Sequence, residues 1–268
     1  TAAQYSGGIR AQSGAIVEIV NSTITKNNAP IEAGISSWGN VLVQIPPSVI
    51  PTEQNSLVTL QNSIVAENSN NTSIYNNLAG SFGANSSYNL LGSVGNTTFT
   101  QTALGNQVLT VGSFAGLAPL GDYGGPTRTH ALLPGRPASN AGNTAATSIT
   151  LDQRGGTRKV GTIDIGAVES QTALMMDIDG DHRKEEFQVI GQTGAILIVD
   201  KSTSTPQISK FFQFDKTQSW KNVLTGDFNG DGRADLAAQD TLTHDWAFSL
   251  SDGNQLLPVK TTTGENWS

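Results

Sequence analysis

The feature that most constrains the fold is an internal repeat near the start of the chain. The segment VEIVNSTITKNN (17–28) aligns without gaps on VTLQNSIVAENS (58–69), at an offset of 41 residues. Each copy alternates apolar and polar residues, turns at an Asn, and alternates again. Short strands that recur at a fixed period indicate a solenoid, in which each coil buries its apolar side only against the next coil.

The composition of residues 1–120 supports this interpretation. The segment contains fifteen Asn but no Asp and no His, and β-branched residues and Gly dominate the rest. Asn at matched turns suits left-handed backbone geometry and hydrogen bonding between stacked coils. We therefore expect an all-β protein that begins with a right-handed parallel β-helix. A β-sandwich is the alternative, but the Asn-Gly and Asp-Gly signals of its hairpins are lacking here.

Four motifs come after this segment, namely GGPT (124–127), THALLPG (129–135), DQRG (152–155) and DIGAVE (164–169). Their order and spacing resemble the C-terminal signature of the choice-of-anchor Q family of bacterial surface proteins. The resemblance covers about residues 1–170 and implies a β-helix on a secreted or cell-surface protein, without a known activity. An open solenoid end exposes strand edges, so we expect 114–170 to be a cap. Its polar and ionic contacts would involve Asp152, Arg154, Arg158, Asp164 and Glu169.

A second repeat occupies residues 171–268, with a different period. LMMDIDGDHRKEEFQVI (174–190) aligns on LTGDFNGDGRADLAAQD (224–240), at an offset of 50 residues. Apolar runs flank each acidic loop, and further strand-like runs come after them, which gives one loop and about four strands per copy. That is the size of a propeller blade. We therefore expect two domains, 1–170 and 171–268, the second built from two blade-like β repeats.

Charge is unevenly distributed between these two parts. Residues 1–170 contain seven Lys and Arg against eight Asp and Glu, whereas residues 171–268 contain eight against fourteen. An acidic segment without a basic stripe argues against nucleic acid as a partner. No apolar run is long enough to insert into a membrane.

Each acidic loop has the ligand spacing of a calcium site. Calcium takes six to eight oxygen ligands from carboxylates, amide oxygens and backbone carbonyls. Side chains at loop positions 1, 3, 5 and 9, with a backbone carbonyl at position 7, can surround one ion. The predicted ligands are Asp177, Asp179, Asp181, Arg183 and Glu185 in the first loop, and Asp227, Asn229, Asp231, Arg233 and Asp235 in the second.

The second loop matches the pattern better than the first. Gly232 stands where the turn needs a positive φ, and His182 stands there in the first loop. An EF-hand is excluded, because Gln188 and Ala238 occupy the position of its bidentate Glu. The alternative to calcium is a pair of solvated turns that hold no ion, which the repetition of the whole ligand set disfavours.

The two loops with their flanking runs resemble the FG-GAP (VCBS-type) repeats of integrin-like propellers. This resemblance covers residues 171–268 and implies calcium bound between strands. Trp267 stands before the end of the chain as Trp220 stands before the second loop, which suggests that a third repeat begins there. We therefore expect either a segment of a larger surface protein or a chain whose open edges are completed by its neighbours.

An enzymatic function is not expected for this segment. A glycosidase on a β-helix needs paired carboxylates about 5–9 Å apart, and Glu18 and Glu32 would meet only by accident of coil register. His130 lies in the cap and has no partner for a catalytic or zinc site. A polysaccharide lyase whose active site lies upstream stays open as an alternative.

The favoured function is that of a non-catalytic extracellular or cell-surface structural or adhesive protein. Its calcium-stabilised repeats would engage another surface protein or copies of the same chain, assembling into filaments because unpaired strand edges invite augmentation. A carbohydrate-binding surface module is the other alternative, in which exposed aromatic side chains stack on a polysaccharide. The candidate aromatic residues are Trp38, Tyr75, Phe82 and Tyr88.

Overall fold

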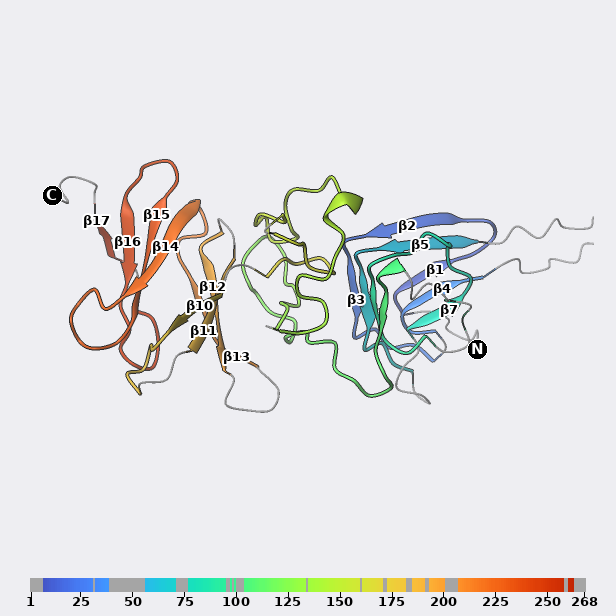
Figure 1. The fold of residues 1–268 in the computed structure, drawn as a ribbon, viewed down its shortest axis with the longest axis horizontal. Coiled ribbons are helices and arrows are strands. Elements are labelled where there is room, and N and C mark those ends of the chain that lie inside the picture. The colour runs from blue at the N-terminus through green and yellow to red at the C-terminus, as the bar shows by residue number, and fades with distance from the viewer. Residues whose placement is uncertain are drawn as a thin grey trace, which may run out of the picture. The chain divides into compact units, whose positions relative to one another are not determined.

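The computed structural model confirms the all-β class (Figure 1). It describes residues 7–30, 32–38, 56–70, 77–94, 97, 99, 104–133, 135–159, 161–170, 173–181, 185–190, 193–200, 207–257 and 260–262. Two compact units are present. One comprises Thr1–Gly116, Arg136–Ser148 and Gly161–Ala167, and the other Leu117–Gly135, Ile149–Val160 and Val168–Ser268.

The first unit contains three parallel sheets, ordered β1-β4-β7, β2-β5 and β3-β6-β8-β9. All of its strands are short, as expected of a chain that turns after every few residues. Their bounds are Ile9–Ala11 (β1), Ile16–Val20 (β2), Thr23–Thr25 (β3), Ile35–Ser37 (β4), Leu57–Gln61 (β5), Ile64–Ala66 (β6), Leu78–Gly80 (β7), Leu90–Leu91 (β8) and Gln107–Val108 (β9). A 3₁₀ helix, Thr144–Ala146, is capped by the side chain of Asn143.

The strand register reproduces the alignment of the first sequence repeat. Val17 pairs with Val58 between β2 and β5, and Ile24 pairs with Val65 between β3 and β6, both at the offset of 41. Such pairing places like residues above one another, so Ile19, Val58 and Leu60 share one buried core. The repeat predicted from the sequence is thus a repeat of strands in space.

Asn side chains connect successive levels of this unit. The backbone amide of Asn27 donates to Oδ1 of Asn68, and that of Asn68 donates to Oδ1 of Asn77, at 3.1 and 3.0 Å. Asn89 and Asn106 repeat the arrangement at 3.0 Å. These amides satisfy buried turns that the strand ladders leave unpaired, as buried backbone groups require.

The two turns of each repeat differ in which residue adopts the left-handed conformation. At the first turn it is Asn, as the sequence suggests, with φ of 47° at Asn21 and 46° at Asn62. At the second turn it is the residue before Asn, namely Lys26 and Glu67, each at 58°. These two side chains form an ion pair across adjacent levels, which gives the strained turns a polar contact in return.

The aromatic candidates of this unit do not share one environment. Phe82 is buried in the core and packs edge-on against Phe99, with ring centroids 5.9 Å apart. Tyr88 is half-buried and Trp38 is exposed, while Tyr75 lies outside the described residues. Phe82 therefore packs in the core, where it has no surface to offer a sugar.

The second unit contains two antiparallel four-stranded sheets with strands in chain order, β10 to β13 and β14 to β17. The first comprises Ala173–Met176 (β10), Glu185–Ile190 (β11), Ala195–Asp200 (β12) and Gln207–Gln213 (β13). The second comprises Trp220–Gly226 (β14), Asp235–Asp240 (β15), Trp246–Ser249 (β16) and Lys260–Thr262 (β17). The offset of 50 residues therefore relates two whole sheets.

Parts of the segment predicted to be a cap belong to each unit. In the second unit Tyr123, Ala131 and Leu133 share a core with Ala195 and Leu197 of β12. A buried ion pair lies in the same unit, in which the guanidinium of Arg154 contacts the carboxylate of Asp152 at 2.7 Å and donates to the carbonyl of Glu169. In the first unit Asp164 accepts a hydrogen bond from the amide of Asn140.

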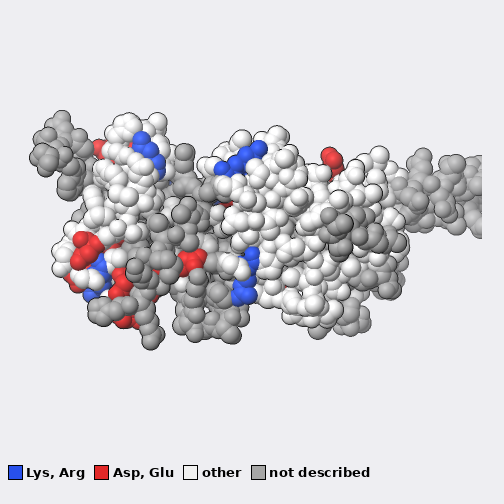
Figure 2. Space-filling model, viewed as in Figure 1, with Lys and Arg blue, Asp and Glu red and all other residues white. Residues whose placement is uncertain are grey.

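Acidic side chains are concentrated on the second unit. On the visible face in Figure 2, red atoms gather over the region of β10–β17, whereas the β1–β9 region shows few coloured atoms. Within the described part of the chain, no helix is long and apolar enough to span a membrane.

Candidate metal site

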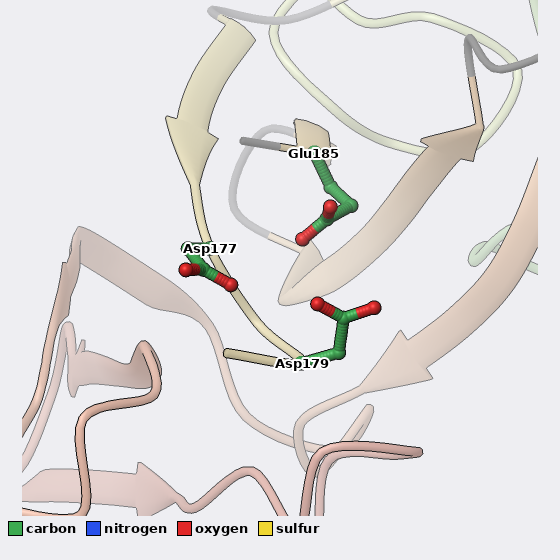
Figure 3. Close-up of side chains that lie close together, drawn as sticks. All are labelled: Asp177, Asp179 and Glu185. Atoms are coloured by element: carbon green, nitrogen blue, oxygen red, sulfur yellow. The ribbon is translucent and has the colours of Figure 1, made fainter. Parts of the chain in front are cut away.

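The first acidic loop brings three of its predicted ligands together. Asp177 comes directly after β10, Asp179 lies at the tip of the turn, and Glu185 is the first residue of β11. One oxygen from each lies within 4.8 Å of one from each of the others. Figure 3 shows the carboxylates of Asp179 and Glu185 directed toward each other, with Asp177 beside them.

Backbone amides hold these carboxylates in place. The amide of Ile178 donates to Oε2 of Glu185 at 2.9 Å, that of Gly180 to Oδ1 of Asp177 at 2.7 Å, and that of Asp181 to Oδ1 of Asp179 at 3.1 Å. Such bonds close the loop and fix the orientation of each carboxylate before any ion arrives.

The electrostatics of the cluster favour a cation. Burial raises the pKa of Glu185 above its ordinary value of 4.5, and the neighbouring charges of Asp179 and Asp177 raise it further, while the bond from Ile178 acts in the opposite direction. Like charges this close repel one another. A bound cation would remove that repulsion and stabilise the ionised form of Glu185.

The cluster fits a hard divalent cation. Oxygens bind calcium at about 2.3–2.6 Å, so two of them on opposite sides of one ion lie about 5 Å apart. The separation of at most 4.8 Å in the cluster agrees with that distance. All three ligands are carboxylates and the chain has no Cys, which favours calcium or magnesium over softer metals.

The second loop repeats the same turn on its own residues. The amide of Phe228 donates to Oδ2 of Asp235 at 2.9 Å, that of Gly230 to Oδ1 of Asp227 at 2.7 Å, and that of Asp231 to Oδ1 of Asn229 at 3.0 Å. Each of these bonds corresponds to one in the first loop at an offset of 50 residues. The turn chemistry of the two loops is therefore common to both.

Its carboxylates are nevertheless differently engaged. Arg233 binds Asp231 twice, through its backbone amide and through its guanidinium at 2.9 and 2.8 Å. Asp235 is fully buried, and its second oxygen accepts the amide of Ser251 at 2.8 Å. Within the described residues, the one group of three His, Cys, Asp or Glu side chains spaced to share a metal ion is that of the first loop.

The remaining predicted ligands stay predictions. Asp181 is exposed at the tip of the first loop, and Arg183 lies outside the described residues. Asp227 and Asn229 are exposed, and Asp227 accepts bonds from Gly230, Asp231 and Gly232. A calcium ion at the second loop would have to share these oxygens with backbone amides and with Arg233.

Hydrogen bonds connect the two loops to each other. The amide of Ala234 donates to the carbonyl of Asp177 at 2.7 Å, and the hydroxyl of Ser251 donates to the carbonyl of Ile178 at 2.6 Å. Since the amide of Ser251 also donates to Asp235, Ser251 bridges the first loop and the strand that comes after the second. No sequence pattern pointed to Ser251, because its role depends on a contact 73 residues away.

The second unit also contains a polar pocket that the sequence did not suggest. Its volume is about 570 Å³, and the GGPT and DQRG motifs contribute Gly125 and Arg154 to its wall. Other parts of the wall carry hydroxyl, amide and ammonium groups, from Thr193, Gln213, Lys216, Thr217, Gln218 and Ser219. No predicted metal ligand among the described residues lines this pocket.

Comparison with known proteins returns no relative. No family model, no curated protein and no solved structure matches the chain. The class defined by the described residues is therefore an all-β protein with an acidic loop able to hold a metal ion.

Proposed function

We propose that this protein is a non-catalytic structural or adhesive protein of the bacterial cell surface or extracellular space, stabilised by calcium. Its first part would be a right-handed parallel β-helix, and its second part blade-like calcium-binding repeats of the FG-GAP type. Parallel strands stacked at a constant offset support the first interpretation. Two antiparallel sheets related by one offset support the second.

The observation that carries the proposal is the carboxylate cluster of Asp177, Asp179 and Glu185. It lies where β10 leads into β11, and hydrogen bonds attach its loop to the second sheet. A cation here would neutralise repelling charges and stiffen the junction of the two sheets, which is a mechanical role. Extracellular modules bind calcium at about 10⁻⁴–10⁻³ M, concentrations available outside the cell.

Calcium binding is tested by isothermal titration of metal-free protein, together with thermal unfolding. Calcium at tenfold its dissociation constant should stabilise the native protein by about 1.4 kcal/mol. The Asp179→Asn variant should lose most of this stabilisation. The Asp122→Asn variant, which removes an exposed carboxylate of the same unit, should keep it. Equal calcium responses of the two variants would contradict the proposed site.

Assembly is tested by sedimentation velocity, with calcium and with EGTA. Calcium-dependent growth into long species would support a structural polymer whose repeats need the ion. A compact monomer in both conditions would contradict the filament hypothesis and leave adhesion to another surface protein as the question.

A second candidate function, carbohydrate binding, is favoured by the polar pocket of the second unit. Hydroxyl and amide groups hydrogen-bond sugar hydroxyls, and the ammonium of Lys216 would favour an acidic sugar. Titration with a uronic acid oligomer and with its neutral counterpart distinguishes this function. Binding of the acidic oligomer that Lys216→Ala abolishes would support it, and no heat with either ligand would exclude it.

A further inference from the structure

The two sheets of the second unit stack by one rule. One face of the first sheet carries Ile178, Phe187, Ile196 and Ile198, all of them buried. These side chains share a core with Trp220, Leu236, Ala238 and Ala247 of the second sheet. The opposite face of the first sheet carries Ala195 and Leu197, which pack against Tyr123, Ala131 and Leu133 of the preceding segment. The first sheet thus packs one face on the layer before it in the chain and the other face on the layer after it.

The second sheet packs its preceding face on the first sheet. Leu236, Ala238 and Ala247 form this contact, and they correspond at an offset of 50 to Glu186, Gln188 and Leu197. Strand alternation places Ala237, Trp246 and Phe248 on the other face, with Ala237 paired to Phe248 in register. Among the described residues, this outer face has no counterpart of the core that covers the first sheet.

Exposure shows the difference at equivalent positions. Phe228 corresponds to Ile178, and it is 44 % exposed where Ile178 is 2 % exposed. Trp246 and Phe248 correspond to Ile196 and Ile198, and they are half-buried where the isoleucines are fully covered. Leu224, 50 % exposed, lies on the same face, in register with Ala237. Phe228 packs edge-on against Phe248 and extends this apolar surface.

We propose that this outer face, defined by Leu224, Phe228, Trp246 and Phe248, is a docking surface for a further sheet of the same repeat. Its partner is a four-stranded antiparallel sheet that presents an aromatic residue and small aliphatic residues, as the second sheet does through Trp220, Ala238 and Ala247. Repeat units of this kind bury their apolar faces only against neighbouring units.

Side-chain size selects a repeat sheet over a second copy of the outer face. In the observed core, large residues of the first sheet meet Ala238 and Ala247 of the second. The outer face is again rich in large residues, so two copies of it would set aromatic side chains against aromatic side chains. Interiors pack densely when large residues face small ones.

The absence of Cys from the chain makes the test direct, because a single introduced thiol reports its own accessibility. In the 268-residue protein, a thiol-reactive dye should label the Phe228→Cys variant at least about tenfold faster than the Ile178→Cys variant, whose position is covered. The Leu242→Cys variant, at a site 83 % exposed outside this face, should label fast in every form of the protein.

The decisive variant extends the chain with a second copy of residues 221–262 after Trp267, so that Trp267 takes the sequence position of Trp220. Labelling of Phe228→Cys should slow at least about tenfold in the extended chain, while Leu242→Cys is unchanged. Asp in place of the appended copies of Leu236 and Ala238 should restore fast labelling. These results do not depend on calcium binding and would stand if the proposed metal site failed.

Three results would overturn the proposal. The first is fast labelling of Phe228→Cys in an extended chain whose appended sheet is folded. The second is an appended sheet that stays protease-sensitive while residues 1–268 remain folded, because the face then fails to organise the partner it is said to fit. The third is a dimer of the 268-residue protein that protects Phe228→Cys, which would assign the face to a second copy.

Discussion

The two acidic loops have the same backbone hydrogen bonds but engage their carboxylates differently. In the first loop Asp177, Asp179 and Glu185 lie close enough together to share an ion. In the second loop Asp231 is paired with Arg233, and Asp235 is buried between two backbone amides. A common turn therefore does not by itself make a metal site. The number of carboxylate oxygens that the surrounding structure leaves for the ion decides whether it does.

The largest expected difference concerns the last carboxylate of each loop. Asp235→Ala leaves the amides of Phe228 and Ser251 without their acceptor, and we expect a loss of about 3 kcal/mol in the free energy of unfolding. Glu185→Ala removes one such bond and also relieves repulsion within the cluster, so we expect a loss of about 1 kcal/mol or less in metal-free protein. Urea unfolding measures both.

Equal losses at the two positions would show that the carboxylates have the same structural role, which contradicts the comparison. Asp122→Ala is the control, since an exposed carboxylate without such contacts should change the free energy of unfolding by less than about 0.5 kcal/mol.

The hydroxyl that bridges the two sheets should have an intermediate effect. Ser251→Ala removes the donor to the carbonyl of Ile178 and should cost about 1 to 2 kcal/mol. Because that bond also positions the first loop, calcium affinity should fall as well. Thermal unfolding and calcium titration check this, with Thr243→Ala, an exposed position of the same sheet, as control. An unchanged calcium affinity would separate the ion from the sheet junction.

A smaller effect is expected from Arg233. The guanidinium occupies Asp231 at 2.8 Å, and an ion pair that is partly exposed to solvent is weak enough for a divalent cation to displace. Arg233→Gln should therefore strengthen calcium binding at the second loop by about two- to fivefold. Calcium titration of this variant in the Asp179→Asn background isolates the second loop. A weaker affinity there would mean that Arg233 helps to shape the site.

The smallest effect is on the pH dependence of stability, and the two loops should differ in sign. The pKa of Glu185 is raised by burial and by nearby carboxylates, so its contribution to stability declines as pH rises from about 4.5 through the folded-state pKa. The pKa of Asp231 is lowered, first by the amide of Arg233, so its contribution is present above its unfolded-state pKa and lost as pH falls through the folded-state value.

Carboxyl carbon NMR titration of metal-free protein measures both pKa values directly. A pKa of Glu185 at or below its ordinary 4.5 would show that the cluster is not preformed. Glu185→Gln should remove the decline in stability with rising pH and leave the contribution of Asp231 in place.

Strand pairing in the first unit was predictable to the residue, because the repeat fixes the register. Val17 and Val58 align in sequence and pair in space, and Asn21 and Asn62 adopt the left-handed turn. The left-handed conformation of Lys26 and Glu67 was not predictable, since residue type disfavours it. It depends on stacking that puts the two charges in contact.

The candidate site was predictable in its residues but not in its order of strength. Gly232 and the Asp-rich pattern of the second loop pointed to residues 227–235 as the better site. The structure instead clusters the carboxylates of the first loop. The reasons are tertiary: the pairing of Arg233 with Asp231, and the burial of Asp235 by a contact with Ser251. Neither contact leaves a signature in a local pattern.

The hydrogen bonds of the second loop also bear on how the protein ages chemically. Asn229 precedes Gly230, the pairing at which deamidation is fastest in a flexible chain, because the Gly nitrogen can attack the Asn side chain. Here the Gly230 amide donates to Asp227 at 2.7 Å, and the Asn229 side chain both accepts from and donates to Asp231. With nucleophile and electrophile both held, the turn that resembles a calcium loop is also a safeguard against slow conversion of Asn229 to Asp.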